Sequence, residues 1–171
     1  MTNLSAYIRA VPDFPKPGII FRDITPLLAD GQAFRSVVDT IAERYRDRVD
    51  MVLGIESRGF IIGAPVAYVL GSGLALVRKP GKLPSHTYSA AYALEYGNDA
   101  LEIHSDAFGH PCRVLIVDDL LATGGTARAA VQLVERLGGE VVACTFVIEL
   151  PALKGRERLG RCPVTSLIEY A

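Results

Sequence analysis

Two adjacent carboxylates and a glycine-rich turn follow one apolar run of this sequence. The stretch reads VLIVDDLLATGGTA over residues 114–127, and Asp118 and Asp119 come directly after four apolar residues. Glycines let a backbone come close to a ligand, and unpaired N–H groups at the start of a helix attract an anion. The turn that could hold a phosphate monoester in this way consists of Ala122, Thr123, Gly124, Gly125 and Thr126. The alternative is an ordinary glycine-rich connection between a strand and a helix.

The acid pair needs a partner that supplies hydrogen-bond donors or positive charge, because two ionised carboxylates beside a phosphate repel it and each other. Sugar hydroxyls are such donors, and a magnesium ion or a cationic sugar centre would supply the charge. A ribose 5-phosphate with its phosphate on residues 123–126 would place its hydroxyls beside Asp118 and Asp119. The alternative is that one aspartate caps the turn and the other faces solvent.

Other nucleotide-binding motifs are absent from the sequence. No lysine follows Gly124 and Gly125, so the turn is not the phosphate loop of the nucleoside triphosphatases. Gly71 and Gly73 lack the third glycine of the dinucleotide-binding motif.

Short apolar runs alternate with amphipathic segments along the chain. Runs typical of buried strands cover 51–55, 74–77, 114–117, 141–148 and 164–170, and helical periodicity covers 34–45, 60–70 and 126–137. Asp30 is placed to cap the first of these helices. Residues 88–96 and 100–104 flank Gly97-Asn98-Asp99, which favours a hairpin turn. The sequence therefore predicts an α/β fold with a mostly parallel central sheet flanked by helices and a small hairpin.

Ligands of such sheets bind at the carboxyl ends of the strands. Three loops follow predicted strands: Glu56–Gly59, Arg78–Lys82 and Asp118–Thr126. We expect these loops to meet at one edge of the sheet.

Composition and charge narrow the class of protein. The 171 residues are expected to form a single domain spanning residues 1–171, and a net charge of −1 argues against nucleic-acid binding. The longest uncharged run, 59–77, contains Pro65 and several glycines, so we expect helix, turn and strand rather than a membrane span. Scattered cysteines without CxxC spacing favour free thiols and a cytoplasmic location. Neither they nor the three histidines have the spacing of metal ligands.

The stretch 114–127 resembles the phosphoribosyl-diphosphate-binding signature of the type I phosphoribosyltransferases. Five further blocks resemble the adenine phosphoribosyltransferases of that family: DFPKPGIIFRDI (13–24), GIESRGF (54–60), RKPGKLP (78–84), LEYG (94–97) and ELPALKGR (149–156). The blocks extend in the family's order from Asp13 to Arg156, which is nearly the whole chain.

This resemblance implies a reaction. It is the transfer of 5-phosphoribosyl from phosphoribosyl diphosphate to N9 of adenine, giving AMP and diphosphate, in a homodimer. The cofactor implied is Mg²⁺, held mainly by substrate and water rather than by protein ligands.

The resemblance also assigns roles to residues. Phosphoribosyl binding falls to Asp118, Asp119, Ala122, Thr123, Gly124, Gly125 and Thr126. Diphosphate binding falls to Glu56, Ser57, Arg58, Arg78, Lys79 and Lys82, in a region where one peptide bond without proline is expected to be cis. Adenine binding falls to Ile20, Phe21, Arg22 and Leu150, and the catalytic set is Glu95, Arg58 and Tyr96.

Simpler interpretations stay open for several of these side chains. Arg58 could form a surface salt bridge, Phe21 could be an ordinary core aromatic, and the cations of 78–82 could be a solvated loop. The rival functions are a phosphoribosyltransferase for another base and a non-catalytic regulator that senses phosphoribosyl diphosphate.

Overall fold

A parallel sheet forms the centre of the molecule. The structure, a computed structural model, describes residues 3–93 and 98–170. Five strands of this described part pair in parallel in the order β4-β3-β7-β8-β9. Their bounds are β3 Met51–Ile55, β4 Gly73–Val77, β7 Arg113–Leu121, β8 Glu140–Glu149 and β9 Val164–Glu169. In chain order this is a 2-1-3-4-5 sheet, whose direction of progression reverses between β3 and β7, and the predicted fold class is confirmed.

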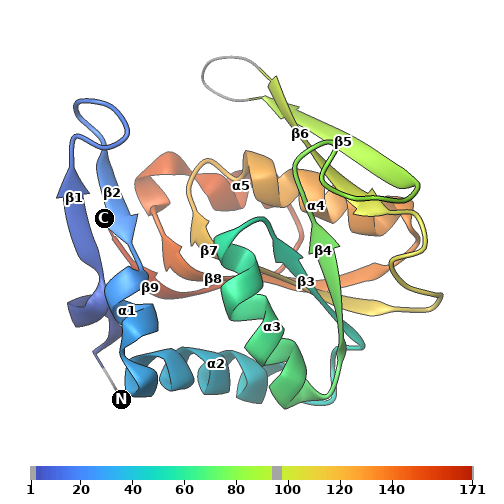
Figure 1. The fold of residues 1–171 in the computed structure, drawn as a ribbon, viewed down its shortest axis with the longest axis horizontal. Helices are drawn as coiled ribbons and strands as arrows, with labels where there is room; N and C mark the ends of the chain where they lie inside the picture. Colours follow the sequence, from blue (N-terminus) through green and yellow to red (C-terminus); the bar gives the residue numbers. More distant parts are fainter. Residues whose placement is uncertain (1–2, 94–97, 171) are drawn as a thin grey trace.

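Helices cover both faces of this sheet (Figure 1). One apolar core joins the sheet to α1 (Thr25–Ala29), α2 (Gly31–Tyr45) and α3 (Arg58–Leu70). A second core joins the opposite face to α4 (Gly125–Arg136), α5 (Gly155–Leu159) and a hairpin. Neighbouring residues of β3 point into different cores, Val52 into the first and Leu53 into the second. This burial of both faces explains why the strands read as continuous apolar runs.

Two antiparallel pairs lie outside the central sheet (Figure 1). The first consists of β1 (Arg9–Pro12) and β2 (Ile20–Asp23), and the second is the hairpin of β5 (Thr87–Ala93) and β6 (Asn98–His104). The predicted turn at Gly97-Asn98-Asp99 is wrong in part, because Asn98 and Asp99 belong to β6 and pair with Ala93 and Tyr92. Contacts of the Asp99 carboxylate with Tyr92 and Lys79 stabilise it in the strand, so tertiary contacts outweigh its turn preference.

Helix ends follow the local chemistry. The Asp30 carboxylate accepts hydrogen bonds from the N–H groups of Gln32 (3.0 Å) and Ala33 (2.8 Å), which confirms it as the cap of α2. The uncharged run 59–77 forms α3, a turn at Gly71 and β4, as predicted. In the part of the chain that the structure describes, none of the helices is long and apolar enough to cross a membrane. Short 3₁₀ segments complete the fold at Leu4–Tyr7 and Pro151–Leu153.

Candidate active site

A cavity of about 260 Å³ lies at the carboxyl ends of β3 and β7, where the strand order reverses. It is lined by Glu56, Ser57, Arg58, Lys79, Tyr92, Leu101 and residues 118–127. All three predicted loops contribute residues to this lining, so their expected convergence on one edge is confirmed. The convergence follows from topology, because parallel strands present their carboxyl ends at the same edge.

The acid pair lies inside β7 rather than after it. The apolar run predicts a strand that ends at Val117, but Asp118 pairs with Phe146 of β8 and the ladder extends to Leu121. Two carboxylates do not end the strand because each has a partner. The Arg58 guanidinium donates from Nε to Asp119 Oδ2 at 2.5 Å, and Asp118 Oδ1 accepts the Asp119 N–H at 2.9 Å.

The charges of this cluster are shared unequally. Asp119 is only 4% exposed and carries the ion pair with Arg58. Burial, and then the neighbouring Asp119 carboxylate, raise the pKa of Asp118 well above its ordinary value. Burial lowers the pKa of Arg58, but Asp119 and Asp118 outweigh that effect, and the pKa is raised. The Arg58 guanidinium, which is ion-paired with Asp119 and close enough to Asp118 to act on its charge, therefore reduces the repulsion between the adjacent carboxylates.

The glycine turn leads directly into α4. Gly124 has φ +81° and is the N-cap residue of α4, which begins at Gly125. A Cβ on Gly124 would lie 2.5 Å from the carbonyl oxygen of Gly155, so the turn also depends on close packing of two backbones. Gly155 is absent from the predicted site, and the only sequence signal for it is its place in the ELPALKGR block.

Glu56 contacts two residues of the predicted basic loop, Arg78 and Lys79. Its Oε1 accepts from Arg78 Nη2 at 3.0 Å, and its Oε2 accepts the Lys79 N–H at 2.9 Å. The Arg78 hydrogen bond is the main reason that the pKa of Glu56 is lowered, although burial opposes it. Arg78 also donates to the Lys82 carbonyl at 3.2 Å, while the Lys82 side chain is exposed and does not line the cavity. The Glu56–Ser57 peptide bond is cis, as the resemblance implies.

Lys79 connects the basic loop to the hairpin. Its Nζ donates to the Tyr92 hydroxyl at 2.9 Å and to the Asp99 carboxylate. Tyr92 also lines the cavity, so the hairpin contributes a cavity residue that is absent from the predicted site. The predicted catalytic residues Glu95 and Tyr96 lie outside the described residues.

None of the four predicted adenine contacts is among the residues that line the cavity. Phe21 packs edge to face on Phe14, with ring centres 5.3 Å apart, and the Arg58 guanidinium lies 5.5 Å from its ring centre. The Arg22 guanidinium instead stacks on Tyr170 at 4.0 Å. The remaining two are Ile20, which is exposed, and Leu150, whose N–H donates to the carbonyl of the cavity residue Leu121 at 2.9 Å. Phe21 and Leu150 therefore each contact a residue that lines the cavity, Arg58 and Leu121 respectively.

Within residues 3–93 and 98–170, no group of three or more His, Cys, Asp or Glu side chains is placed to hold a metal ion. The cavity does contain two adjacent carboxylates, and oxygen is the donor that magnesium prefers.

Comparison with known proteins identifies the class. The phosphoribosyl transferase domain model matches residues 26–159, which include the acid pair, the glycine turn and the basic loop. This match, together with the fold and site, defines a phosphoribosyltransferase.

Relatives of high identity narrow the class. An adenine phosphoribosyltransferase of Chloroflexus aurantiacus is 58% identical over 98% of both chains. The crystal structure of adenine phosphoribosyltransferase from Thermoanaerobacter pseudethanolicus superposes with a TM-score of 0.95, at 50% identity over 98% of both chains. The Saccharomyces cerevisiae enzyme, complexed with adenine and D-2,5-dideoxy-2,5-imino-altritol 1,6-bisphosphate, gives a TM-score of 0.91 at 40% identity over 96% of both chains. The chain belongs to the adenine phosphoribosyltransferase family.

Proposed function

We propose that this chain transfers 5-phosphoribosyl from phosphoribosyl diphosphate to N9 of adenine, giving AMP and diphosphate in purine salvage. One observation carries the proposal: the acid pair, Arg58 and the glycine turn line a single cavity at the switch point of the sheet. The crystal structure of the yeast relative is complexed with adenine and D-2,5-dideoxy-2,5-imino-altritol 1,6-bisphosphate, which supports a site for a base beside a phosphorylated ligand.

The 5-phosphate binds to residues 122–126. The N–H groups at the start of α4 are free of intrahelical partners, and the hydroxyls of Thr123 and Thr126 add donors. A ribose on the β7 side of this phosphate then has its hydroxyls at Asp118 and Asp119, whose carboxyl groups accept hydrogen bonds.

The leaving diphosphate is stabilised by cations of the two neighbouring loops. Negative charge grows on the diphosphate as the bond to ribose breaks, so donors fixed in advance lower the barrier. Arg58, Lys79 and Ser57 line the cavity, and Arg78 and Lys82 lie on the same basic loop as Lys79. An ionised carboxylate repels diphosphate, so Glu56 contributes by holding Arg78 and the Lys79 N–H in place.

The donor set fits Mg²⁺ bound chiefly through substrate. One or two carboxylates plus phosphate oxygens and water is the usual magnesium environment. Three carboxyl groups line the cavity: Asp118, Asp119 and Glu56, of which Glu56 accepts hydrogen bonds from Arg78 and the Lys79 N–H. When bound, the ion would neutralise charge on the diphosphate.

Adenine stacks between Phe21 and Leu150, and the backbone groups of Ile20 and Arg22 read its edge. The stacking of the Arg22 side chain on Tyr170 supports this assignment, because it leaves the backbone as the part of Arg22 available to the base. Glu95 manages the proton on adenine as N9 attacks, and Tyr96 helps to exclude water, which would otherwise attack the same sugar carbon.

A diphosphate-release assay tests the function. Phosphoribosyl diphosphate and Mg²⁺ are offered with adenine, hypoxanthine, guanine, xanthine or orotate in turn. We expect release with adenine alone. Release with another base would identify a different phosphoribosyltransferase, and binding of phosphoribosyl diphosphate without release would identify the sensing regulator.

We further propose that residues 1–171 act as one catalytic domain in a cytoplasmic homodimer. Exposed apolar side chains on α3 and the edge strand β4 support self-association: Ile61, Tyr68, Val69, Leu74 and Leu76, with Tyr68 at 88% exposure. The free thiols of Cys112, Cys144 and Cys162 are compatible with a reducing compartment. Sedimentation equilibrium should give twice the chain mass, and a Tyr68→Glu variant should sediment as a monomer.

A further inference from the structure

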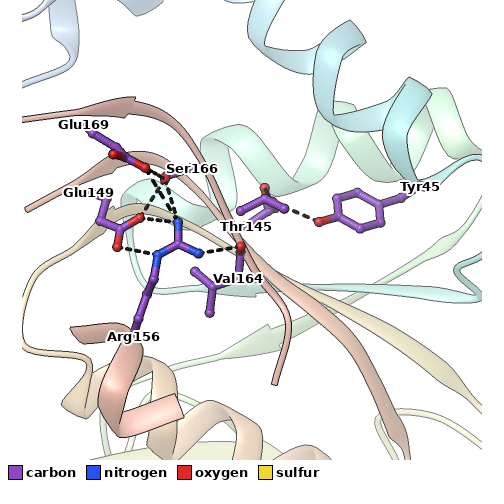
Figure 2. A network of polar contacts seen from close by, with 8 residues as sticks. Tyr45, Thr145, Glu149, Arg156, Val164, Ser166 and Glu169 are labelled. Atoms are coloured by element: carbon purple, nitrogen blue, oxygen red, sulfur yellow. Dashed lines mark hydrogen bonds and ion pairs between the residues drawn. The ribbon is translucent and has the colours of Figure 1, made fainter. Parts of the chain in front are cut away.

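A network of polar contacts surrounds Arg156, away from the cavity lining (Figure 2). The guanidinium donates to both carboxylate oxygens of Glu149, from Nε at 2.7 Å and from Nη2 at 2.6 Å. It also donates to the Val164 carbonyl at 2.8 Å and to Ser166 Oγ at 3.2 Å, and Ser166 itself donates to Glu149 at 2.6 Å. Arg156 therefore joins α5 to the ends of β8 and β9.

Glu149 is almost completely removed from solvent, at 3% exposure. Burial raises the pKa of this carboxyl, but the hydrogen bonds from Arg156 and Ser166 and the charge of Arg156 outweigh burial, and the net pKa is lowered. A buried carboxylate with two-pronged donation from arginine has a strongly fixed geometry, because the planar guanidinium fits both of its oxygens at once.

The ion pair closes a short segment of chain. We call residues 150–155 the strap, since they connect Glu149 at the end of β8 to Arg156 in α5. The strap is also held at its start, where the Leu150 N–H donates to Leu121, and it turns at Lys154 with φ +55°. Both of its ends are thus fixed by contacts that cross to other elements.

The strap packs directly on the glycine turn. A Cβ on Gly155 would lie 2.3 Å from the Ala122 carbonyl oxygen, and a Cβ on Gly124 would lie 2.5 Å from the Gly155 carbonyl oxygen. The backbones of strap and turn therefore touch at two places. A displacement of Gly155 by a few tenths of an ångström would be transmitted to the N–H groups at the start of α4.

We propose that Arg156 and Glu149 are positioning residues, which fix the strap so that Gly155 shapes the phosphate-binding turn and Leu150 keeps its place beside the base. The inference rests on the proposed function, since it assigns the turn to the 5-phosphate. Neither residue touches substrate, and both act through the strap.

The test compares Arg156→Lys with a matched control. Lysine keeps the charge but loses the two-pronged fork. Arg113→Lys makes the same change in the pair between Arg113 and Asp50, which has similar geometry (2.8 and 3.0 Å) at the opposite, amino-terminal end of β7. Thermal unfolding, KM and kcat for both substrates, and calorimetric titration with ribose 5-phosphate are measured for each variant.

Arg156→Lys is expected to raise KM for phosphoribosyl diphosphate and Kd for ribose 5-phosphate roughly tenfold, with a smaller change in kcat. Arg113→Lys is expected to lower Tm while leaving KM and Kd unchanged. Ser166→Ala keeps the ion pair and removes one donor to Glu149, so it should also raise KM for phosphoribosyl diphosphate, by a smaller factor than Arg156→Lys. It also supplies a folded variant if Arg156→Lys does not fold.

A lowered Tm with KM and Kd within twofold of wild type in both Arg156→Lys and Ser166→Ala would overturn the inference. So would an equal rise of KM in Arg113→Lys. A wild-type protein that binds ribose 5-phosphate but transfers it to no base would overturn only the proposed function, since the ribose 5-phosphate titration would still report on the strap. A wild-type protein that does not bind ribose 5-phosphate would overturn both.

Discussion

Replacement of Gly155 by alanine should weaken phosphate binding, because the added Cβ would clash with the backbone of the glycine turn. The added Cβ would lie 2.3 Å from the Ala122 carbonyl oxygen, whereas real Cβ atoms essentially never approach closer than 3.0 Å, so one backbone must move by at least about 0.7 Å. Gly155 does not have a positive φ, so the effect is steric and not conformational. The shift falls on the turn that precedes α4.

Two magnitudes follow from this displacement. Overpacking of this kind costs about 1–3 kcal/mol of unfolding free energy, and in a chain of this length each kcal/mol lowers Tm by roughly 2–4 °C. A misplacement approaching an ångström at a binding site reduces kcat/KM on the order of 10- to 100-fold. The loss should appear mainly as a higher KM for phosphoribosyl diphosphate.

Steady-state kinetics with phosphoribosyl diphosphate as the varied substrate, together with thermal unfolding, measure both effects. Gly109→Ala is the control, because Gly109 is exposed, has no atom within 4 Å of the added Cβ and does not have a positive φ. Its KM should match wild type. A folded Gly155→Ala variant with wild-type KM would refute the claim that the strap shapes the turn.

Four further outcomes are expected. Asp118→Asn should weaken phosphoribosyl-diphosphate binding by about 1–3 kcal/mol in calorimetry, the usual cost of a lost charged hydrogen bond. Because the pKa of Asp118 is raised in the folded protein, its contribution to stability is fully present below pH 3.8 and is lost as pH rises through the folded-state pKa. Asparagine does not titrate, so the Tm of Asp118→Asn should rise relative to the Tm of wild type between pH 3 and pH 7. Glu95→Gln should lower kcat far more than it raises KM, and an unchanged kcat would remove Glu95 from the mechanism. Hydrogen bonds from Arg113 lower the pKa of Asp50 from 3.8 to about 2, so the stability advantage of wild type over Asp50→Asn should disappear as pH falls through that range.

The sequence predicts the sheet well because both of its faces are buried. Each strand then reads as an apolar run, and the amphipathic helices between them leave few topologies open. The location of the site follows from the same pattern, since loops after parallel strands share one edge. What the pattern does not give is the length of β7: Asp118 and Asp119 look like the start of a loop until the guanidinium of Arg58 is known to lie beside them.

Contacts between distant side chains account for most of what the sequence does not predict. Lys79 joins a loop to Tyr92 and Asp99 of the hairpin, and the local propensity of Asp99 for a turn gives no sign of this. The sequence also does not predict the close approach of Gly155 to Gly124, because each of these glycines has the local pattern of an ordinary turn residue. Periodicity reports the burial of a face, whereas such contacts depend on how the faces come together.

Arg58 explains how two adjacent carboxylates can line a cavity proposed to bind an anionic substrate. Its guanidinium pairs with the buried Asp119, lies 5.5 Å from the ring centre of Phe21 and lines the cavity, while its side chain keeps 43% of its surface exposed. One cation therefore offsets the charge of the acid pair in the free protein and still presents surface to a diphosphate. Because Arg58 is the first residue of α3, and Gly59 packs with no room for a Cβ against the Val117 carbonyl, its position is set by the backbone of β7. Strand β7 thus carries Asp118 and Asp119, which are proposed to bind the ribose, and also fixes Arg58, which is proposed to bind the leaving diphosphate. The distance between the ribose site and the diphosphate site is therefore set by one strand.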